Sequence, residues 1–296
     1  MALGDDEIPR LRMAPRGSAE DLAHRISREQ RASQVQRESG LQEPLAPYRV
    51  GSVPYLNSVP LTRGLEDQLV FAPPAQLAQL LLKGELDAAL LSITEVLLTD
   101  RYDILDGIAI ASLGEVKSVF LAHRKPIAEA REILCDPASL TSVSLLRVLL
   151  AEQGLKPEFK LLEDYKQARD ADFVLLIGNP AIDFLRSNPP HEIWDLGAAW
   201  YERFDLPFVY AVWAIRRGID STRLCRILRD ARDFGMDTLD YLITSRSDYD
   251  LDFRKDYLGW HIHYHLGNDE RRGIQQFIDL LQKHGLGPVH PPRYIS

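Results

Sequence analysis

Short, mostly apolar runs recur along the chain, and stretches with a helical spacing of apolar residues separate them. Runs of four to eight such residues between turn signals are typical of buried β-strands. We therefore predict strands over 48–53, 69–74, 87–92, 118–124, 132–136, 172–178 and 208–217. The run at 172–178, DFVLLIG, is apolar almost throughout, which predicts a central strand covered on both faces.

The intervening stretches carry the start and stop signals of helices. Pro74 opens one whose apolar face holds Leu77, Leu80 and Leu81, and Gly84 ends it. Further helices are predicted over 93–98, over 139–154, from an N-cap at Asn179 with Pro180 as first helical residue, and over most of 220–284. Strands that alternate with helices at this spacing indicate an α/β protein with parallel, doubly wound sheets.

The chain divides into three regions by its pattern of apolar and polar residues. Residues 1–46 mix both charge signs and lack a broad apolar face, so we expect a mobile N-terminal extension. The alternation of predicted strands and helices then occurs in two successive regions, which predicts two lobes. We assign 47–112 and 218–296 to lobe 1 and 113–217 to lobe 2, with the strand at 208–217 expected to run back to the first lobe.

Composition narrows the classes of function. A hydrophobic content of 45% with 26% charged residues is ordinary for a globular domain. A net charge of -8 argues against a nucleic-acid partner, because phosphate binding needs a basic surface. No apolar stretch approaches the length of a membrane span, and no signal peptide is visible, so we expect a cytoplasmic protein. Cys135 and Cys225 are expected to be buried, small hydrophobic residues. The sequence leaves the oligomeric state open.

Four strand-to-helix junctions place small polar residues where backbone N–H groups point outward. They are Ser52–Ser58, Ser92–Glu95, Ser139–Ser142 and Gly178–Ala181. One such junction is explained by ordinary helix capping. Four of them, two in each lobe, favour a shared cleft that binds a small anion, because helix N-termini attract negative charge and ligands of α/β sheets bind beyond the strand ends.

Other chemistries find no support in the sequence. There is no GxGxxG after a strand and no GxxxxGK[ST], so we expect no nucleotide cofactor, and no other cofactor is indicated. His261, His263 and His265 alternate as ligands on one side of a strand would, but no fourth ligand is apparent. We interpret them as partly exposed histidines beside a buried Tyr264, and we expect no metal site.

Seven segments carry a family resemblance: RVGSVPYLNSVPLTRGL, LLKGELDAALLSITE, KSVFL, SLTSVSLLRVLL, VLLIGNPA, DLGAAWYERFDLPFVYAVWA and YHLGNDERRGIQQFIDLL. In this order the chain resembles the MqnA-type chorismate dehydratases of the futalosine route to menaquinone. The resemblance runs from about Tyr48 to Pro288. Two positions depart from the family pattern: Pro54 stands where a small or polar residue is usual, and Asp205 stands where glycine is usual.

The resemblance implies a fold like that of type II periplasmic binding proteins, with a small-molecule substrate held between two lobes. It also implies the conversion of chorismate to 3-[(1-carboxyvinyl)oxy]benzoate with loss of water. Asn57 in the YLN motif and Glu95 in the S/T-x-x-E turn become the candidate catalytic residues. The candidate substrate-binding residues are Ser52, Tyr55, Ser58, Ser92, Thr94, Ser118, Thr141, Ser142, Gly178 and Asn179.

Two questions stay open at this point. The general base is either Glu95 or the enolpyruvyl carboxylate of the substrate itself, with a slight preference for the latter. The rival functions are a non-catalytic receptor for small anions, the effector domain of a transcription regulator, and the sibling enzyme that acts on a cyclic futalosine derivative. A regulator would need a helix-turn-helix module, for which residues 1–46 are too short and irregular. The sibling family carries a catalytic histidine in an IHE motif where this chain reads IGNPA.

Overall fold

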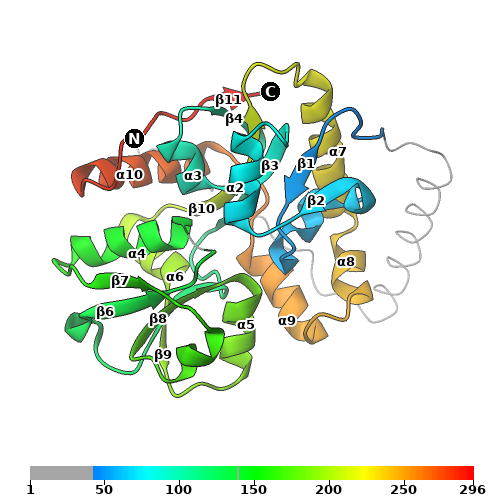
Figure 1. The fold of residues 1–296 in the computed structure, drawn as a ribbon. Helices are drawn as coiled ribbons and strands as arrows, with labels where there is room; N and C mark the ends of the chain where they lie inside the picture. Colours follow the sequence, from blue (N-terminus) through cyan, green and yellow to red (C-terminus); the bar gives the residue numbers. More distant parts are fainter. Residues whose placement is uncertain (1–42, 139) are drawn as a thin grey trace, which may run out of the picture. The chain divides into compact units, whose positions relative to one another are not determined.

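The structure is a computed structural model that describes residues 43–138 and 140–296. These residues contain two β-sheets with helices around them (Figure 1). Each of the seven predicted strands is present, and helices alternate with them as predicted. Residues 1–42, most of the predicted extension, lie outside the described residues. The last part of that extension, residues 43–46, belongs to the folded unit, because Leu45 is only 1% exposed and Glu43 forms an ion pair with Arg223.

The first sheet has six strands in the order β11-β4-β10-β3-β1-β2. Its strands are β1 (Val50–Ser52), β2 (Leu69–Phe71), β3 (Ala88–Ser92), β4 (Tyr102–Ser112), β10 (Phe208–Arg216) and β11 (Tyr294–Ile295). The second sheet has five strands in the order β7-β6-β8-β5-β9. Its strands are β5 (Val119–His123), β6 (Glu132–Cys135), β7 (Glu158–Leu161), β8 (Phe173–Ile177) and β9 (Glu192–Asp195). The central, buried place predicted for 172–178 is confirmed by β8.

The prediction of purely parallel sheets is wrong for one strand in each sheet. Strand β10 runs antiparallel to both β3 and β4, and β5 runs antiparallel to both β8 and β9. Both strands come directly after a crossing of the chain from the other sheet, so each enters its new sheet from the opposite end. An apolar run fixes burial but carries no information about strand direction, which explains the error.

Nine α-helices are described: α2 (Pro74–Leu82), α3 (Ile93–Leu98), α4 (Leu140–Glu152), α5 (Gly178–Arg186), α6 (Leu196–Phe204), α7 (Thr222–Asp237), α8 (Leu239–Ser245), α9 (Leu251–Asp256) and α10 (Asn268–Lys283). Shorter 3₁₀ turns are η1 (Leu56–Thr62), η2 (Glu66–Gln68), η3 (Ile127–Glu129) and η4 (Tyr165–Arg169), and η5 (Tyr257–His261) is a π-helical turn. Across 43–138 and 140–296, no helix combines the length and the apolar character needed to cross a membrane.

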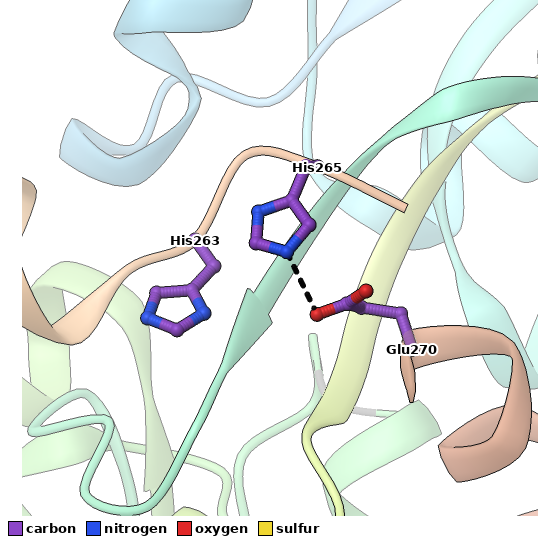
Figure 2. A group of neighbouring side chains, drawn as sticks. All are labelled: His263, His265 and Glu270. Atoms are coloured by element: carbon purple, nitrogen blue, oxygen red, sulfur yellow. Dashed lines mark ion pairs between the residues drawn. The ribbon is translucent and has the colours of Figure 1, made fainter. Parts of the chain in front are cut away.

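Helix termini follow the sequence signals with one exception. Pro74 begins α2, and Gly84 and Gly154 follow α2 and α4 with φ of +72° and +77°, which glycine adopts without strain. At the start of α10, Glu270 accepts a hydrogen bond from the Gly267 N–H and pairs with His265 (Figure 2). The N-cap predicted at Asn179 is wrong, because α5 already begins at Gly178.

Asp205, the departure from the family pattern, occupies a left-handed backbone position. It ends α6 with φ of 51° and ψ of 39°, and its N–H donates to the Tyr201 carbonyl. This conformation favours glycine and tolerates aspartate, so the substitution keeps the geometry of the turn.

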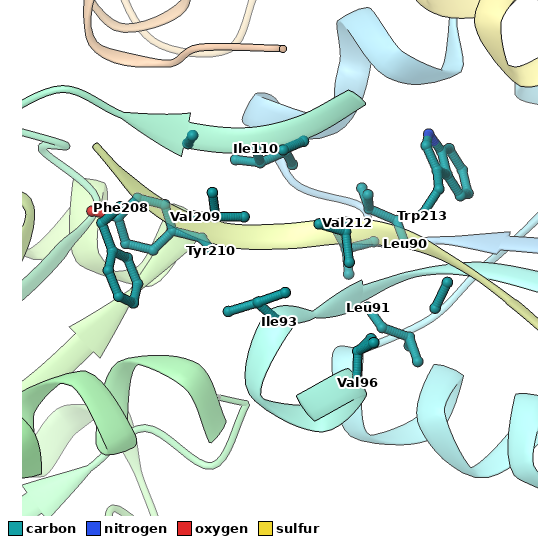
Figure 3. Packing of buried hydrophobic residues seen from close by; sticks show 14 of the residues in the cluster. Leu90, Leu91, Ile93, Val96, Ile110, Phe208, Val209, Tyr210, Val212 and Trp213 are labelled. Carbon is teal, nitrogen blue, oxygen red and sulfur yellow. The ribbon is translucent and has the colours of Figure 1, made fainter. Parts of the chain in front are cut away.

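The strand β10 forms the centre of the main hydrophobic core. Val212 and Trp213 are fully buried, and Figure 3 shows β10 between side chains of β3 and β4 such as Leu90 and Ile110. The strand predicted at 208–217, assigned to lobe 2 and expected to run back to the first lobe, pairs within the first sheet as β10. Strand β9 is the last strand of the second sheet, and the chain returns to the first sheet at Phe208.

Candidate functional site

A pocket of about 650 Å³, including the space open to solvent, is lined by residues of both sheets. The first sheet contributes Leu90, Ile110 and Tyr210 from three neighbouring strands. The second sheet contributes Val119 of β5 and Ile177 of β8. The remaining lining residues come mainly from the segment after β1, from the connection before β5, and from the starts of α2, α4 and α5. The pocket therefore lies where the predicted junctions meet.

Seven of the twelve predicted site residues line this pocket. They are Tyr55, Asn57, Ser92, Ser118, Thr141, Ser142 and Gly178. The other five are not among its lining residues: Ser52, Ser58, Thr94, Glu95 and Asn179. Of the junction Ser139–Ser142, Ser139 lies outside the described residues.

Three hydroxyl groups of the pocket already accept a hydrogen bond from the protein. Ser92 Oγ accepts from the Glu95 N–H at 3.3 Å as the N-cap of α3, as predicted for this junction. Thr141 Oγ1 accepts from the Thr94 N–H at 3.1 Å, and Ser118 Oγ accepts from the Tyr257 hydroxyl at 2.8 Å. A hydroxyl has one proton to donate, so each of these groups can direct its own O–H towards a ligand.

Asn57 belongs to the same network. Its side chain hydrogen-bonds the buried Tyr257 hydroxyl, which donates in turn to Ser118. Its Oδ1 atom is buried and has no partner among the described residues. The side chain does not cap a helix: Asn57 lies inside η1, whose N-cap is Tyr55. Burial raises the pKa of Tyr257, so its hydroxyl stays protonated and remains a donor.

Four of the predicted residues outside the pocket are Ser52, Ser58, Thr94 and Asn179. Two of them form hydrogen bonds within the protein, and the hydroxyls of the other two have no hydrogen-bond partner among the described residues. Ser58 is 1% exposed and its hydroxyl donates to backbone carbonyls of the same loop, those of Val53 and Tyr55. Asn179 Oδ1 accepts from the Leu56 N–H at 3.4 Å. The Ser52 and Thr94 hydroxyls are buried, and the structure gives neither a partner among the residues it describes.

Glu95 is half-buried on α3, and its carboxylate does not line the pocket. Its Oε1 accepts from the Thr99 hydroxyl at 3.5 Å, one helical turn further on. Burial raises the pKa of the Glu95 carboxyl, and the hydrogen bond from Thr99 opposes this only in part. Of the Ser92–Glu95 turn, therefore, Ser92 alone is among the residues that line the pocket.

The described lining of the pocket contains no lysine, arginine, histidine, aspartate or glutamate. Its polar groups are hydroxyls, one side-chain amide and backbone groups, among them Gly178, which has φ of +58°. A Cβ atom at Gly178 would also meet the Tyr55 ring at 3.5 Å. An anion in this pocket is held by neutral donors rather than by opposite charge.

Sequence reasoning missed two tyrosines of the site. Tyr210 on β10 lines the pocket, and its hydroxyl lies 3.0 Å from Ser112 Oγ. Tyr257 contacts Ser118 although the two residues are 139 positions apart. The sequence holds only a weak signal for either, a polar atom inside an otherwise apolar run.

The histidines of the GWHIHYH segment separate into two environments. His261 contacts the Glu115 carbonyl and Asp256. His263 and His265 lie together with Glu270, which the sequence did not single out; their potential ligand atoms are all within 4.8 Å of one another. Burial and the neighbouring His265 lower the pKa of His263, whereas Glu270 raises the pKa of His265. Tyr264 is 4% exposed, as predicted.

Comparison with solved structures supports the two-lobed fold. A protein from Archaeoglobus fulgidus superimposes with a TM-score of 0.65 at 18% identity, covering 81% of this chain and 98% of that chain. The alkanesulfonate-binding protein SsuA from Xanthomonas axonopodis pv. citri gives a TM-score of 0.55 at 16% identity, covering 81% and 94%. At these identities the likeness concerns the fold alone, which is that of periplasmic binding proteins, as the resemblance implied.

Comparison of sequences is more specific. A sequence model of a menaquinone biosynthesis family matches residues 48–283. A chorismate dehydratase from Thermus thermophilus is 33% identical over 261 residues, which cover 80% of this chain and 96% of that protein. The family match spans every strand of the two sheets except β11, and every residue that lines the pocket. This chain therefore belongs to the menaquinone biosynthesis family and is of the chorismate dehydratase type.

Proposed function

We propose that this protein converts chorismate to 3-[(1-carboxyvinyl)oxy]benzoate and water. The observation that carries the proposal is the set of hydroxyls at Ser92, Ser118 and Thr141, each of which already accepts one hydrogen bond from a protein N–H or O–H and keeps its own proton to donate. Such hydroxyls present protons to a ligand. Chorismate is a dianion, and preoriented neutral donors can bind carboxylates without a compensating cation.

The reaction is an elimination within the substrate ring. The proton on the ether-bearing ring carbon passes to the base, the electron pair of that C–H bond forms a new ring double bond, and the neighbouring C–O bond breaks. The departing hydroxyl takes up the proton from the base and leaves as water. The ring becomes aromatic, so the protein has to orient the reacting groups more than to drive the reaction. In our proposal Asn57 contacts the reacting part of the ring, because its Oδ1 has no partner among the described residues and the pocket adjoins it.

We infer that the base is the substrate's own enolpyruvyl carboxylate. The described pocket lining offers no ionisable carboxylate, imidazole or amine that could take the proton. Glu95 is the candidate that the sequence left open, and its side chain contacts Thr99 outside the lining. A base must come within hydrogen-bond reach of the proton that it removes. The substrate carboxylate is on the same molecule and satisfies this condition by orientation alone.

Replacing Glu95 by glutamine tests this assignment. Turnover should fall by no more than about threefold, because the variant keeps the backbone N–H that donates to Ser92 Oγ and loses only a negative charge outside the pocket wall. The measurement is kcat and KM with chorismate, beside a melting curve that verifies folding. A folded Glu95→Gln protein without activity would identify Glu95 as the base instead.

Replacing Tyr257 by phenylalanine tests the network behind the donors. The change removes the proton given to Ser118 and the partner of the Asn57 side chain, so both groups lose their orientation. We expect kcat/KM to fall about tenfold or more, in keeping with the loss of a buried hydrogen-bond partner. Tyr264→Phe is the matched control, because the buried Tyr264 hydroxyl has no partner among the described residues. Equal activity in the two variants would contradict the network.

The function itself is tested with purified protein and chorismate. We expect a new aromatic absorbance to appear and the product to be identified by mass, with one water lost per chorismate. If chorismate is bound but stays unchanged, as seen by calorimetry and by the absorbance, a non-catalytic receptor for small anions becomes the better interpretation. The cytoplasmic location expected from the sequence stays a prediction.

A further inference from the structure

We propose that His263, His265 and Glu270 bind one divalent transition-metal ion of the Zn²⁺ type, at a site separate from the chorismate pocket. None of the three residues is among those that line the pocket. Their potential ligand atoms all lie within 4.8 Å of one another, and His265 Nε2 is 3.0 Å from Glu270 Oε1 (Figure 2). This inference revises the expectation, drawn from the sequence, that the chain has no metal site.

The chemistry of the donors fits a borderline-soft cation. Two imidazoles and one carboxylate form a ligand set that zinc sites use when the fourth position is open to water. A separation of 3.0 Å between His265 Nε2 and Glu270 Oε1 is close to that of two ligands on one tetrahedral metal ion, whose bonds are about 2.0–2.2 Å long. The ligand atom of the third residue, His263, lies within 4.8 Å of the other two.

The surroundings hold the ligands in place. The second carboxylate oxygen of Glu270 accepts the Gly267 N–H at 2.8 Å, and Glu270 is only 4% exposed. The backbone of His263 is fixed to β4 by two hydrogen bonds with Ala111, at 2.8 Å and 3.0 Å. The rings of His263 and His265 lie nearly parallel, 5.6 Å apart. Outer contacts of this kind orient ligands before a metal arrives and raise its affinity.

The competing explanation is an ion pair that only stabilises the start of α10. His265 and Glu270 form such a pair, and Glu270 completes a capping box with Gly267. This explanation assigns no role to the His263 side chain. The nearby charges are mixed, with Arg232 opposing a cation and Asp269 favouring one. The two explanations therefore differ in whether replacing His263 weakens the binding of Zn²⁺.

The test is a Zn²⁺ titration of the metal-free full chain by calorimetry, in competition with a chelator of known affinity. We expect one equivalent of Zn²⁺ to bind and to raise the melting temperature, because it binds only the folded arrangement. His263→Ala should weaken binding by at least about tenfold, the loss that even outer-shell partners of a metal cause. Glu270→Gln keeps an oxygen for the Gly267 N–H and should weaken binding as well. His261→Ala, in the same segment but outside the cluster, should bind Zn²⁺ as the unchanged protein does.

Two results would overturn the proposal. One is a wild-type protein that takes up no Zn²⁺ at micromolar concentrations. The other is a His263→Ala variant that binds Zn²⁺ with unchanged affinity, since the cluster would then be an ion pair and the zinc bound elsewhere. Neither result depends on the dehydratase reaction, so the metal site and the proposed function stand or fall separately.

Discussion

Replacing Asn57 by alanine should lower turnover of chorismate about 100-fold, the effect of removing one hydrogen-bonding group from the transition state. The melting temperature should fall only slightly, because Asn57 caps no helix and the change removes one buried hydrogen bond, the one with the Tyr257 hydroxyl. Its Oδ1 has no partner among the described residues, so the folded protein loses no acceptor contact with the change. The measurements are kcat, KM and a melting curve for the same preparation.

The neighbouring residue supplies the control for this prediction. Ser58→Ala removes a buried hydroxyl that donates to the Val53 and Tyr55 carbonyls at 2.7 Å and 2.8 Å. It should cost about 1 kcal/mol of unfolding free energy and change turnover little. If Asn57→Ala loses stability and keeps its turnover, the residue has a structural role and the catalytic assignment is wrong.

Replacing Asp195 by alanine should produce the largest loss of stability, about 3 kcal/mol or more of unfolding free energy. Its carboxylate accepts the Gly197 and Ala198 N–H groups at the start of α6, at 2.9 Å and 3.0 Å. It also accepts the Val116 and Lys117 N–H groups at 3.1 Å and 2.8 Å. Residues 113–118 and α6 lie on the two connections between the sheets, so one side chain ties both together.

The Asp195→Asn variant separates the contribution of the cap on α6 from that of the contacts with Val116 and Lys117. Its amide oxygen can still cap α6, whereas its NH₂ group would face a backbone N–H of the other connection. We expect a loss of stability smaller than that of the alanine variant and a higher KM for chorismate, since Val116 and Ser118 line the pocket. Urea unfolding and steady-state kinetics measure both effects. A loss below about 1 kcal/mol for Asp195→Ala would mean that water replaces the carboxylate and that the connections are independent of it.

The sequence predicted those site residues whose position follows from local structure. Ser92 ends a predicted strand directly before a helix, and Thr141 stands in the first turn of a predicted helix. Both line the pocket. Glu95 was chosen by the same reasoning, but its carboxylate accepts a hydrogen bond from Thr99 at the end of α3 and does not line the pocket. A junction in the sequence thus identifies the loop, while the contacts that each side chain makes in the folded protein decide which of them lines the pocket.

Contacts between distant segments could not be predicted. Tyr257 meets Ser118 across 139 residues, and Glu270 joins His263 and His265 only because the start of α10 folds back onto the preceding segment. No periodicity in the sequence encodes these pairs, because each residue looks locally like part of an apolar or a capping segment. The two rings and the carboxylate became a candidate metal site only through this packing.

The sequence by itself determined the burial of the strands, the turns at Gly84 and Gly154, and the family resemblance. These depend on side-chain polarity and on backbone sterics, which act over a few residues. The tertiary structure alone decided the antiparallel course of β5 and β10, the return of the chain to the first sheet at Phe208, and the neutral, donor-lined character of the pocket. Those features arise from which segments pair across the chain, and pairing is a property of the whole fold rather than of any one segment.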